Sequence, residues 1–179
     1  MPIAAEGHEP DFMPWMRRKS DYVALLHQVH RTFYDLNVEV DFVFPDAPKF
    51  TGYRLLVVPA LYVADQALLL RIASFVKAGG HVLMTFKSGV ADENSRVRHI
   101  RLPGPLREAA GVSYQEFSTL ERPLALKGDP FAIGADGNHV MYWAEFLETE
   151  SAQPLAYYDH PFFGPDGRRS RGTATATAL

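Results

Sequence analysis

Residues 55–86 read LLVVPALYVADQALLLRIASFVKAGGHVLMTF, and this stretch decides the fold. Its first four residues, 55–58, form a short apolar run rich in β-branched side chains, which is typical of a strand buried on both faces. Asp65 can cap a helix over 65–78 that ends at two glycines, and residues 81–86 form the next apolar run. Because a helix connects the two runs, the sequence predicts parallel strands with a right-handed crossover and therefore an α/β fold.

A second helix and a further strand are predicted on the N-terminal side of this unit. Ser20 can cap the helix, whose apolar positions step by four and three residues and form one stripe. The stripe consists of Tyr22, Leu26, Val29, Phe33 and Leu36. Residues 38–44 then alternate between apolar and more polar positions until Pro45, which predicts a strand with one more polar face.

The C-terminal half is predicted to hold a short helix and several strands. Pro103, Gly104 and Pro105 can start a helix that runs to Ala110 and closes at Gly111. The predicted strands or strand-like segments cover 112–117, 124–126, 139–146 and 154–158. Together the elements predict an open, mostly parallel sheet flanked by helices.

Composition divides the chain and excludes several classes of function. Residues 1–16 are predicted to be irregular, 17–163 to form one α/β domain, and 164–179 to be a disordered tail rich in glycine, arginine, threonine and alanine. A chain of 179 residues is too short for an eight-fold barrel, and a net charge of −3 gives no global field for nucleic acid.

The absence of cysteine excludes disulfides, thiol catalysis and cysteine-based zinc sites. Residues 1–10 do not read as a signal peptide, and no apolar run approaches the ~20 residues of a membrane-spanning helix. We therefore expect a cytoplasmic protein with no cofactor, no metal, and neither nucleic acid nor a membrane as its partner.

The turn after residues 81–86 is where an open α/β sheet would bind a ligand. It contains Phe86, Lys87 and Ser88, and Asp92 and Glu93 follow shortly after. A nucleophile elbow needs glycine two positions before and after the serine, but Phe86 and Val90 stand there. A capping or turn-forming serine therefore competes with a nucleophile as the interpretation of Ser88.

Other candidate groups lack the partners that their chemistry needs. His27 and His30 have a spacing that can chelate a metal, but the sequence marks no third ligand. The scattered acids Asp92, Glu93, Glu116, Glu145, Glu148 and Glu150 cannot be paired for glycoside hydrolysis from sequence alone. Arg168, Arg169 and Arg171 lie in the tail without interleaved aromatic residues, which favours a solvated tail over a phosphate-binding patch.

Aromatic residues gather towards the two ends of the chain, Trp15 and Trp143 among them. Such side chains bury a large area with few rotamers, so they are enriched at protein interfaces and at surfaces that face sugars. Burial in the core is the competing interpretation. We regard Trp15 and Trp143 as possible ligand or interface positions.

Five segments in order resemble one known family. They are DFMPWM at 11–16, VEVDFV at 38–43, YRLLVVPALY at 53–62, FKSG at 86–89 and YYDHPFFG at 157–164. The set resembles the middle, trimer-forming domain of the family 42 β-galactosidases, enzymes of carbohydrate metabolism. The resemblance implies a flavodoxin-like, class I glutamine-amidotransferase-like sheet and a non-catalytic role in assembly.

The resemblance implies partners but carries no catalytic residue. In the family the catalytic glutamates lie on a separate barrel, so we expect either a homotrimer or attachment to a separate β-galactosidase catalytic chain. The segments of the family before residue 11 and after Gly164 have no clear match here, which predicts a sheet lacking its first and last strands and suggests a free-standing or truncated chain. An independent sugar- or ligand-binding protein and a weak hydrolase acting through Ser88 are the alternatives.

Overall fold

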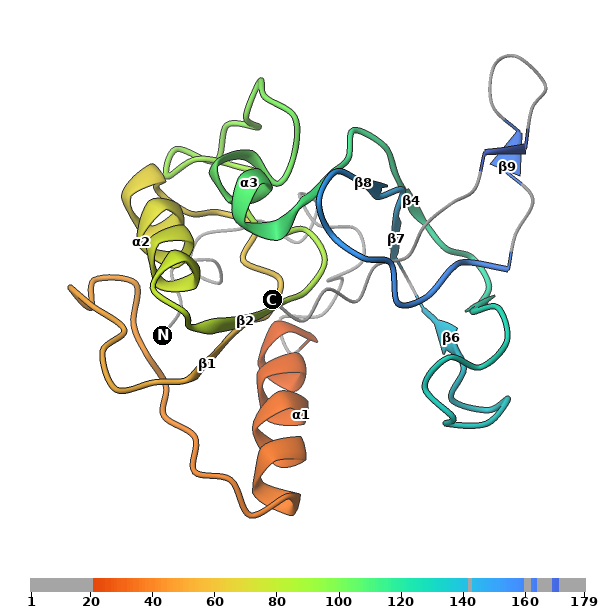
Figure 1. The fold of residues 1–179 in the computed structure, drawn as a ribbon, viewed down its shortest axis with the longest axis horizontal. Coiled ribbons are helices and arrows are strands. Elements are labelled where there is room, and N and C mark those ends of the chain that lie inside the picture. The colour runs from red at the N-terminus through yellow and green to blue at the C-terminus, as the bar shows by residue number, and fades with distance from the viewer. Residues whose placement is uncertain (1–20, 142, 160–161, 164–168, 171–179) are drawn as a thin grey trace.

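The strand–helix–strand unit is present in the computed structural model, which describes residues 21–141, 143–159, 162–163 and 169–170. β1 (Leu55–Val58) pairs in parallel with β2 (His81–Met84), and α2 (Gln66–Lys77) connects them (Figure 1). The Asp65 carboxylate caps α2 by accepting a hydrogen bond of 2.6 Å from the Leu68 N–H. The parallel unit predicted from residues 55–86 is therefore confirmed.

The largest hydrophobic core lies between α2 and this strand pair. Leu68, Leu69 and Ile72 project from α2 onto Val58 and Val82, and the Leu69 side chain has no solvent exposure. Two adjacent parallel strands leave a face that only a covering helix can bury. The α2 stripe supplies that cover.

A short helical turn follows and ends where only glycine fits. The 3₁₀ turn η3 (Gly104–Leu106) continues into α3 (Arg107–Ala110), as predicted for this region. Gly111 has φ of 65°, and a Cβ there would lie 2.8 Å from the main-chain nitrogen of Ala152. The Gly111 carbonyl accepts hydrogen bonds from three consecutive N–H groups, those of Glu150, Ser151 and Ala152. Gly111 thereby ties α3 to the C-terminal half of the domain.

The C-terminal half is built from short antiparallel pairs instead of further parallel strands. The pairs are β3 (Val112–Ser113) with β8 (Glu148–Thr149), β4 (Phe117–Thr119) with β7 (Trp143–Glu145), β5 (Leu124–Ala125) with β6 (His139–Val140), and β9 (Phe162–Phe163) with β10 (Arg169–Ser170). Among the named strands in the described part of the chain, only β1 and β2 pair in parallel. The prediction of a mostly parallel sheet is therefore confirmed for β1 and β2 alone, while the other named strand pairs are antiparallel. The described connections in this half contain no crossover helix, which parallel pairing of consecutive strands would need.

Two predicted strands are absent. Residues 38–44 are not a strand, because no strand of the described chain pairs with them, and Val38, Val40, Phe42 and Phe44 are 50%, 36%, 58% and 50% exposed. Residues 154–158 form only an isolated bridge between Tyr158 and Leu126. The alternation of residue types in 38–44 is typical of extended chain, but a strand also needs a neighbour that pairs with it through hydrogen bonds.

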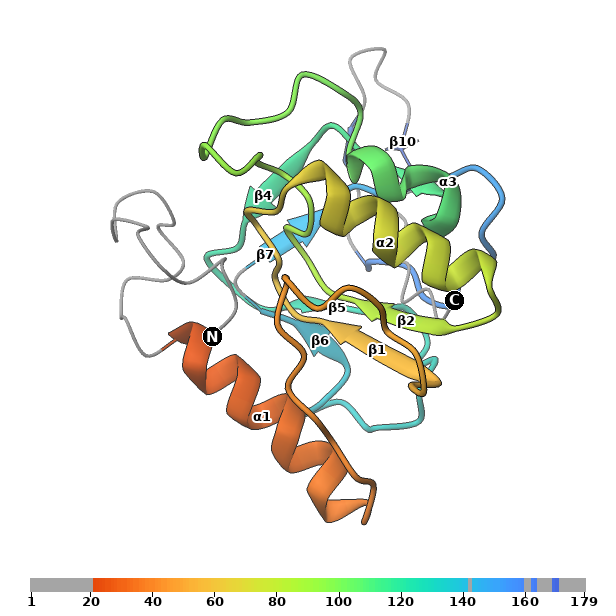
Figure 2. The same cartoon turned by 90° about the vertical axis from the view of Figure 1, so that its left-hand side faces the viewer.

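The helix α1 (Asp21–Asp35) forms as predicted, although Ser20 lies outside the described residues. It stands apart from β1, on the side opposite α2 (Figure 2). No helix within the described residues is long and apolar enough to cross a lipid bilayer. The predicted irregular segment 1–16 and most of the predicted tail 164–179 also fall outside the description, but Arg169–Ser170 in that tail forms β10.

We predict that Leu69→Ala lowers the free energy of unfolding by about 2–5 kcal/mol, because it leaves a cavity at the centre of the α2 core. The matched control is Leu70→Ala, since Leu70 is the next residue of the same helix and is 48% exposed. Urea unfolding followed by circular dichroism measures both. Equal losses in the two variants would contradict the assignment of this core.

Candidate functional site

The turn that leaves β2 is held by its own side-chain hydroxyls. The Ser88 hydroxyl donates to the Thr85 carbonyl at 2.9 Å and accepts from the Leu61 N–H at 3.3 Å. The Thr85 hydroxyl accepts from the Ala60 N–H at 2.7 Å. Ser88 is 2% exposed and joins two loops at the ends of β1 and β2. This geometry supports the turn-forming interpretation of Ser88.

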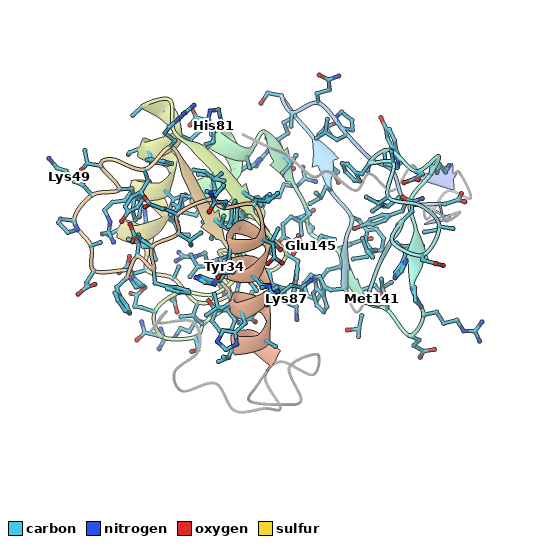
Figure 3. All side chains as sticks on the ribbon, turned by 90° about the horizontal axis from the view of Figure 1, so that it is seen from below. Tyr34, Lys49, His81, Lys87, Met141 and Glu145 are labelled. Carbon is cyan, nitrogen blue, oxygen red and sulfur yellow. The ribbon has the colours of Figure 1, made fainter. Side chains whose placement is uncertain are left out.

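Lys87 and Glu145 connect this turn to β7 in the other half of the domain. The Lys87 main-chain N–H donates to the Glu145 carboxylate at 2.6 Å. Lys87 has φ of 56°, a left-handed conformation that residues other than glycine rarely adopt. The hydrogen bond to Glu145 stabilises that conformation. Figure 3 shows the two side chains close together between α1 and the antiparallel half.

The Lys87 ammonium lies over an aromatic ring. Its nitrogen is 3.4 Å from the centroid of Trp143, and Lys87 is only 5% exposed. The Trp143 ring also stacks on Phe117 across the β4–β7 pair, with centroids 4.6 Å apart and planes inclined by 28°. A cation held against the face of an indole away from water is a favourable contact. Trp143 therefore positions the end of the Lys87 side chain.

Burial shifts the pKa of both ionisable groups towards their neutral forms. It lowers the pKa of Lys87 from 10.5 to about 8, and the negative charge of Glu145 partly opposes the change. Burial raises the pKa of Glu145, while the Lys87 N–H, the Tyr114 hydroxyl, the Trp143 indole N–H and the charge of Lys87 lower it. Burial also raises the pKa of Tyr114. Burial of the charged forms of Lys87 and Glu145 therefore costs free energy, and the contacts between the two groups and their neighbours reduce that cost.

A cavity of about 420 Å³ lies beside this cluster. Its walls come from the end of β2, from the loop at Pro103, and from β6 and β7. The lining is apolar apart from six side chains that carry polar atoms, those of Thr85, Ser88, Tyr114, Trp143, Glu145 and Tyr158. Of the acidic residues that the structure describes, only Glu145 lines the cavity. A pair of carboxylates for glycoside hydrolysis is therefore not assembled there.

The structure brings together some of the residues singled out by sequence and separates others. Phe86, Ser88 and Trp143 line the cavity, and Lys87 touches Trp143. The Asp92 carboxylate instead accepts hydrogen bonds of 2.9 Å from the N–H groups of Asn94 and Arg96, which closes a surface turn. Glu93 is exposed, and neither acid lines the cavity. Trp15 lies outside the described residues.

Sequence reasoning did not identify Tyr114, and it treated Glu145 as one of several scattered acids. Glu145 is 58 residues from Lys87 along the chain. No local pattern marks such a pair. An acid two positions after Trp143 in an apolar strand was the one weak signal of a buried charge.

The two candidate metal ligands lie in different surroundings. His27 is exposed, while the His30 ring stacks on the Phe42 ring with centroids 5.8 Å apart. The described residues contain no group of three potential metal ligands.

Comparison with known proteins assigns the domain. A family profile described as "Beta-galactosidase trimerisation domain" matches residues 13–167. The chain belongs to the β-galactosidase trimerisation domain family. The resemblance drawn from the five sequence segments is therefore confirmed.

Relatives of this trimerisation domain are much longer proteins. Beta-galactosidase Bga of Halorubrum lacusprofundi is 32% identical over 182 residues, which cover 97% of this chain and 24% of that protein. Beta-galactosidase BgaB of a Geobacillus species is 32% identical over 141 residues, covering 78% of this chain and 20% of the relative. The chain therefore spans a quarter or less of the length of these relatives.

Solved structures agree with the fold. The β-galactosidase of Halorubrum lacusprofundi superposes with a TM-score of 0.71 at 27% identity, covering 92% of this chain and 23% of that one. The β-galactosidase of Rahnella sp. R3 gives a TM-score of 0.71 at 24% identity, over 89% of this chain and 25% of that one. This second likeness concerns the fold alone.

The buried Lys87 ammonium makes the stability of the trimerisation domain depend on pH. Its pKa is lowered to about 8 in the folded chain, so above that pH the unfolded chain binds more protons and stability rises with pH. The penalty of the buried charge is fully present below pH 8. We predict a gain of about 1–2 kcal/mol in the free energy of unfolding between about pH 8 and 9.5.

Urea unfolding at several pH values measures this gain. Lys87→Met removes the titrating group, so its stability should change little over the same window. Lys49→Met, at an exposed position, is the control and should keep the rise. The raised pKa values of Tyr22 and Tyr158, both about 12, make stability fall as pH passes 10, which is why the window ends below that value. The assignment fails if Lys87→Met keeps the full rise.

Proposed function

We propose that this chain is a non-catalytic assembly module of a β-galactosidase. The match of residues 13–167 to the trimerisation domain family is the observation that carries the proposal. The small share of each relative that the chain covers fits a module of a larger enzyme. The cavity beside Lys87, with Glu145 as its one acid among the described residues, gives no arrangement for glycoside hydrolysis.

The assembly is proposed to be a homotrimer, or a complex with a separate catalytic chain. The antiparallel half carries large apolar side chains that are exposed in the single chain. They are Phe131, Ile133, Met141, Leu155 and Tyr157, each between 40% and 55% exposed. Figure 3 labels Met141 in this half. Exposed apolar surface of this kind supports a contact with another protein subunit.

We also propose that the assembled domain has the flavodoxin-like, glutamine-amidotransferase-like sheet implied by the sequence resemblance. The parallel β1–α2–β2 unit supports this, since it is the repeating element of such sheets. The strand pairs of the C-terminal half differ from such a sheet because they are antiparallel.

We predict that the purified chain has a solution mass of three times its 20.0 kDa and that Ile133→Asp shifts it towards the monomer. A buried carboxylate without a partner strongly destabilises an interface. Ile100→Asp is the matched control, because Ile100 and Ile133 are 54% and 55% exposed. Size exclusion with light scattering over a range of concentrations measures the mass. A clean monomer at every concentration, with no complex on addition of a β-galactosidase catalytic chain, would count against the proposal.

A second function, binding of a small sugar, is favoured by one feature of the cavity. The Tyr114 hydroxyl and the Trp143 indole nitrogen are buried beside the Glu145 carboxylate, whose pKa they lower, but neither makes a hydrogen bond of good geometry among the described residues. Both line a space of about 420 Å³, where ligand hydroxyls could satisfy them.

Calorimetric titration with galactose and lactose tests the second function. Binding should be lost in Trp143→Leu, which removes the ring and its donor, and kept in Ser88→Ala if that serine only shapes the turn. The absence of heat from either sugar at millimolar concentration would remove this function. Hydrolysis of an ester substrate that Ser88→Ala abolishes would instead support the hydrolase alternative.

A further inference from the structure

Residues 127–138 connect β5 to β6, and both ends of this β5–β6 loop are held by hydrogen bonds. The Leu126 N–H donates to the Asn138 carbonyl at 3.1 Å, and the Asn138 side-chain amide donates to the Leu126 carbonyl at 2.7 Å. The Lys127 N–H donates to the Tyr157 carbonyl at 2.9 Å, which ties the loop to a further stretch of chain. Figure 1 shows the loop beside β6, at the opposite end of the long axis from α2.

Hydrogen bonds inside the β5–β6 loop fix its shape. The Asp129 carboxylate accepts from the Ile133 N–H at 3.0 Å and from the Gly134 N–H at 2.9 Å. The Ala132 N–H donates to the Asp129 carbonyl at 3.1 Å. Gly137 lies against Ile133, since a Cβ added to this glycine would be 3.5 Å from the Ile133 Cβ. The loop therefore has a defined conformation although most of it is exposed.

Two residues of the loop adopt a left-handed backbone that side chains disfavour. Asp129 has φ of 45° and Ala132 has φ of 53°. The conformation is unfavourable for alanine because its Cβ approaches the following carbonyl oxygen. Such strain persists only where surrounding contacts enforce it, and it is concentrated at functional sites. The two hydrogen bonds to the Asp129 carboxylate are contacts of this kind.

Phe131 and Ile133 flank Ala132 and are held in contact with water on this fixed backbone. Their side chains are 43% and 55% exposed. Exposure of large apolar side chains costs free energy, which burial against a partner recovers. A pair whose backbone is already fixed loses little conformational entropy when it binds. Strain and apolar exposure at the same place therefore indicate a recognition loop.

We propose that the β5–β6 loop is a preformed anchor through which this domain binds a second copy of itself, with Phe131 and Ile133 buried against an apolar surface of that copy. Asp129 is the positioning residue, because its carboxylate holds the backbone that carries both side chains. This role rests on the proposed assembly function and adds the loop and the residue that set the geometry of the contact.

A second copy of the chain is the partner that fits this loop. The family profile that matches residues 13–167 is described as a trimerisation domain. A net charge of −3 on the chain gives only weak repulsion between copies. The charges of Lys127, Asp129 and Asp136 nearly balance within the loop, so an apolar surface suits it better than a charged one. Copies around a closed ring meet through unlike surfaces, so the loop contacts a different part of the next copy.

Self-association of the full 179-residue chain, measured by sedimentation equilibrium, tests the anchor. Phe131→Ala removes an anchor ring, and Asp129→Ala removes the acceptor that holds the loop, so each should weaken association at least tenfold. Asp129→Asn keeps an acceptor oxygen and a residue type that tolerates the left-handed backbone, so it should recover most of the loss. Asp136→Ala changes an exposed acid of the same loop and should associate normally as the matched control.

Two further measurements separate positioning from a loss of fold. Asp129→Ala should have no additional effect on association in an Ile133→Asp background, because the anchor is already lost there. In dilute solution, where the wild-type chain is monomeric, hydrogen exchange at the Ile133 and Gly134 amides should be at least tenfold slower than in Asp129→Ala. The urea midpoint of Asp129→Ala should stay close to that of the wild type, since the loop is largely exposed.

The outcomes distinguish this anchor from the assembly function. A chain that neither self-associates nor binds a β-galactosidase catalytic chain overturns both. A chain that binds the catalytic chain but never itself overturns the anchor alone, since the loop then has a different partner. Self-association that Phe131→Ala and Asp129→Ala leave unchanged also overturns the anchor alone. So does fast exchange at Ile133 and Gly134 in the dilute wild-type chain, because the loop is then not preformed.

Discussion

Burial of the α2 stripe against β1 and β2 is the constraint on which the rest of the domain depends. Leu69, without solvent exposure, lies at the centre of this contact, and Leu106 of η3 packs into the same core. The contact fixes where both strands end. It therefore also fixes the turn that carries Lys87 and Ser88.

The turn after β2 then couples the two halves. A single carboxylate, that of Glu145, reaches from β7 to the Lys87 N–H, and Trp143 on the same strand holds the Lys87 ammonium. Gly111 adds a second tie through the three N–H groups that its carbonyl accepts. A buried charged pair contributes little net stability, but removing one member is costly, so such contacts specify how the halves meet. This arrangement suits a module whose role is to present a defined shape.

Apolar side chains gather at two places on the described part of the chain. The antiparallel half exposes apolar side chains around Ile133, and apolar residues of α1 and β1 line a groove of about 830 Å³. Both features follow from the same fact, that short strands bury apolar surface only when neighbours cover them. We propose that another protein subunit packs on the first of these surfaces.

The sequence by itself determined α1, β1, α2, β2 and the turn at Gly111, because each depends on local periodicity, on capping by Asp65, or on the backbone freedom of glycine. It also determined the family through five ordered segments. Tertiary structure alone decided that no described strand pairs with residues 38–44, that the later strands pair antiparallel, and that Glu145 meets Lys87 across 58 residues. Pairing and burial are properties of neighbours in space, and the spacing of residues along one chain carries no direct record of them.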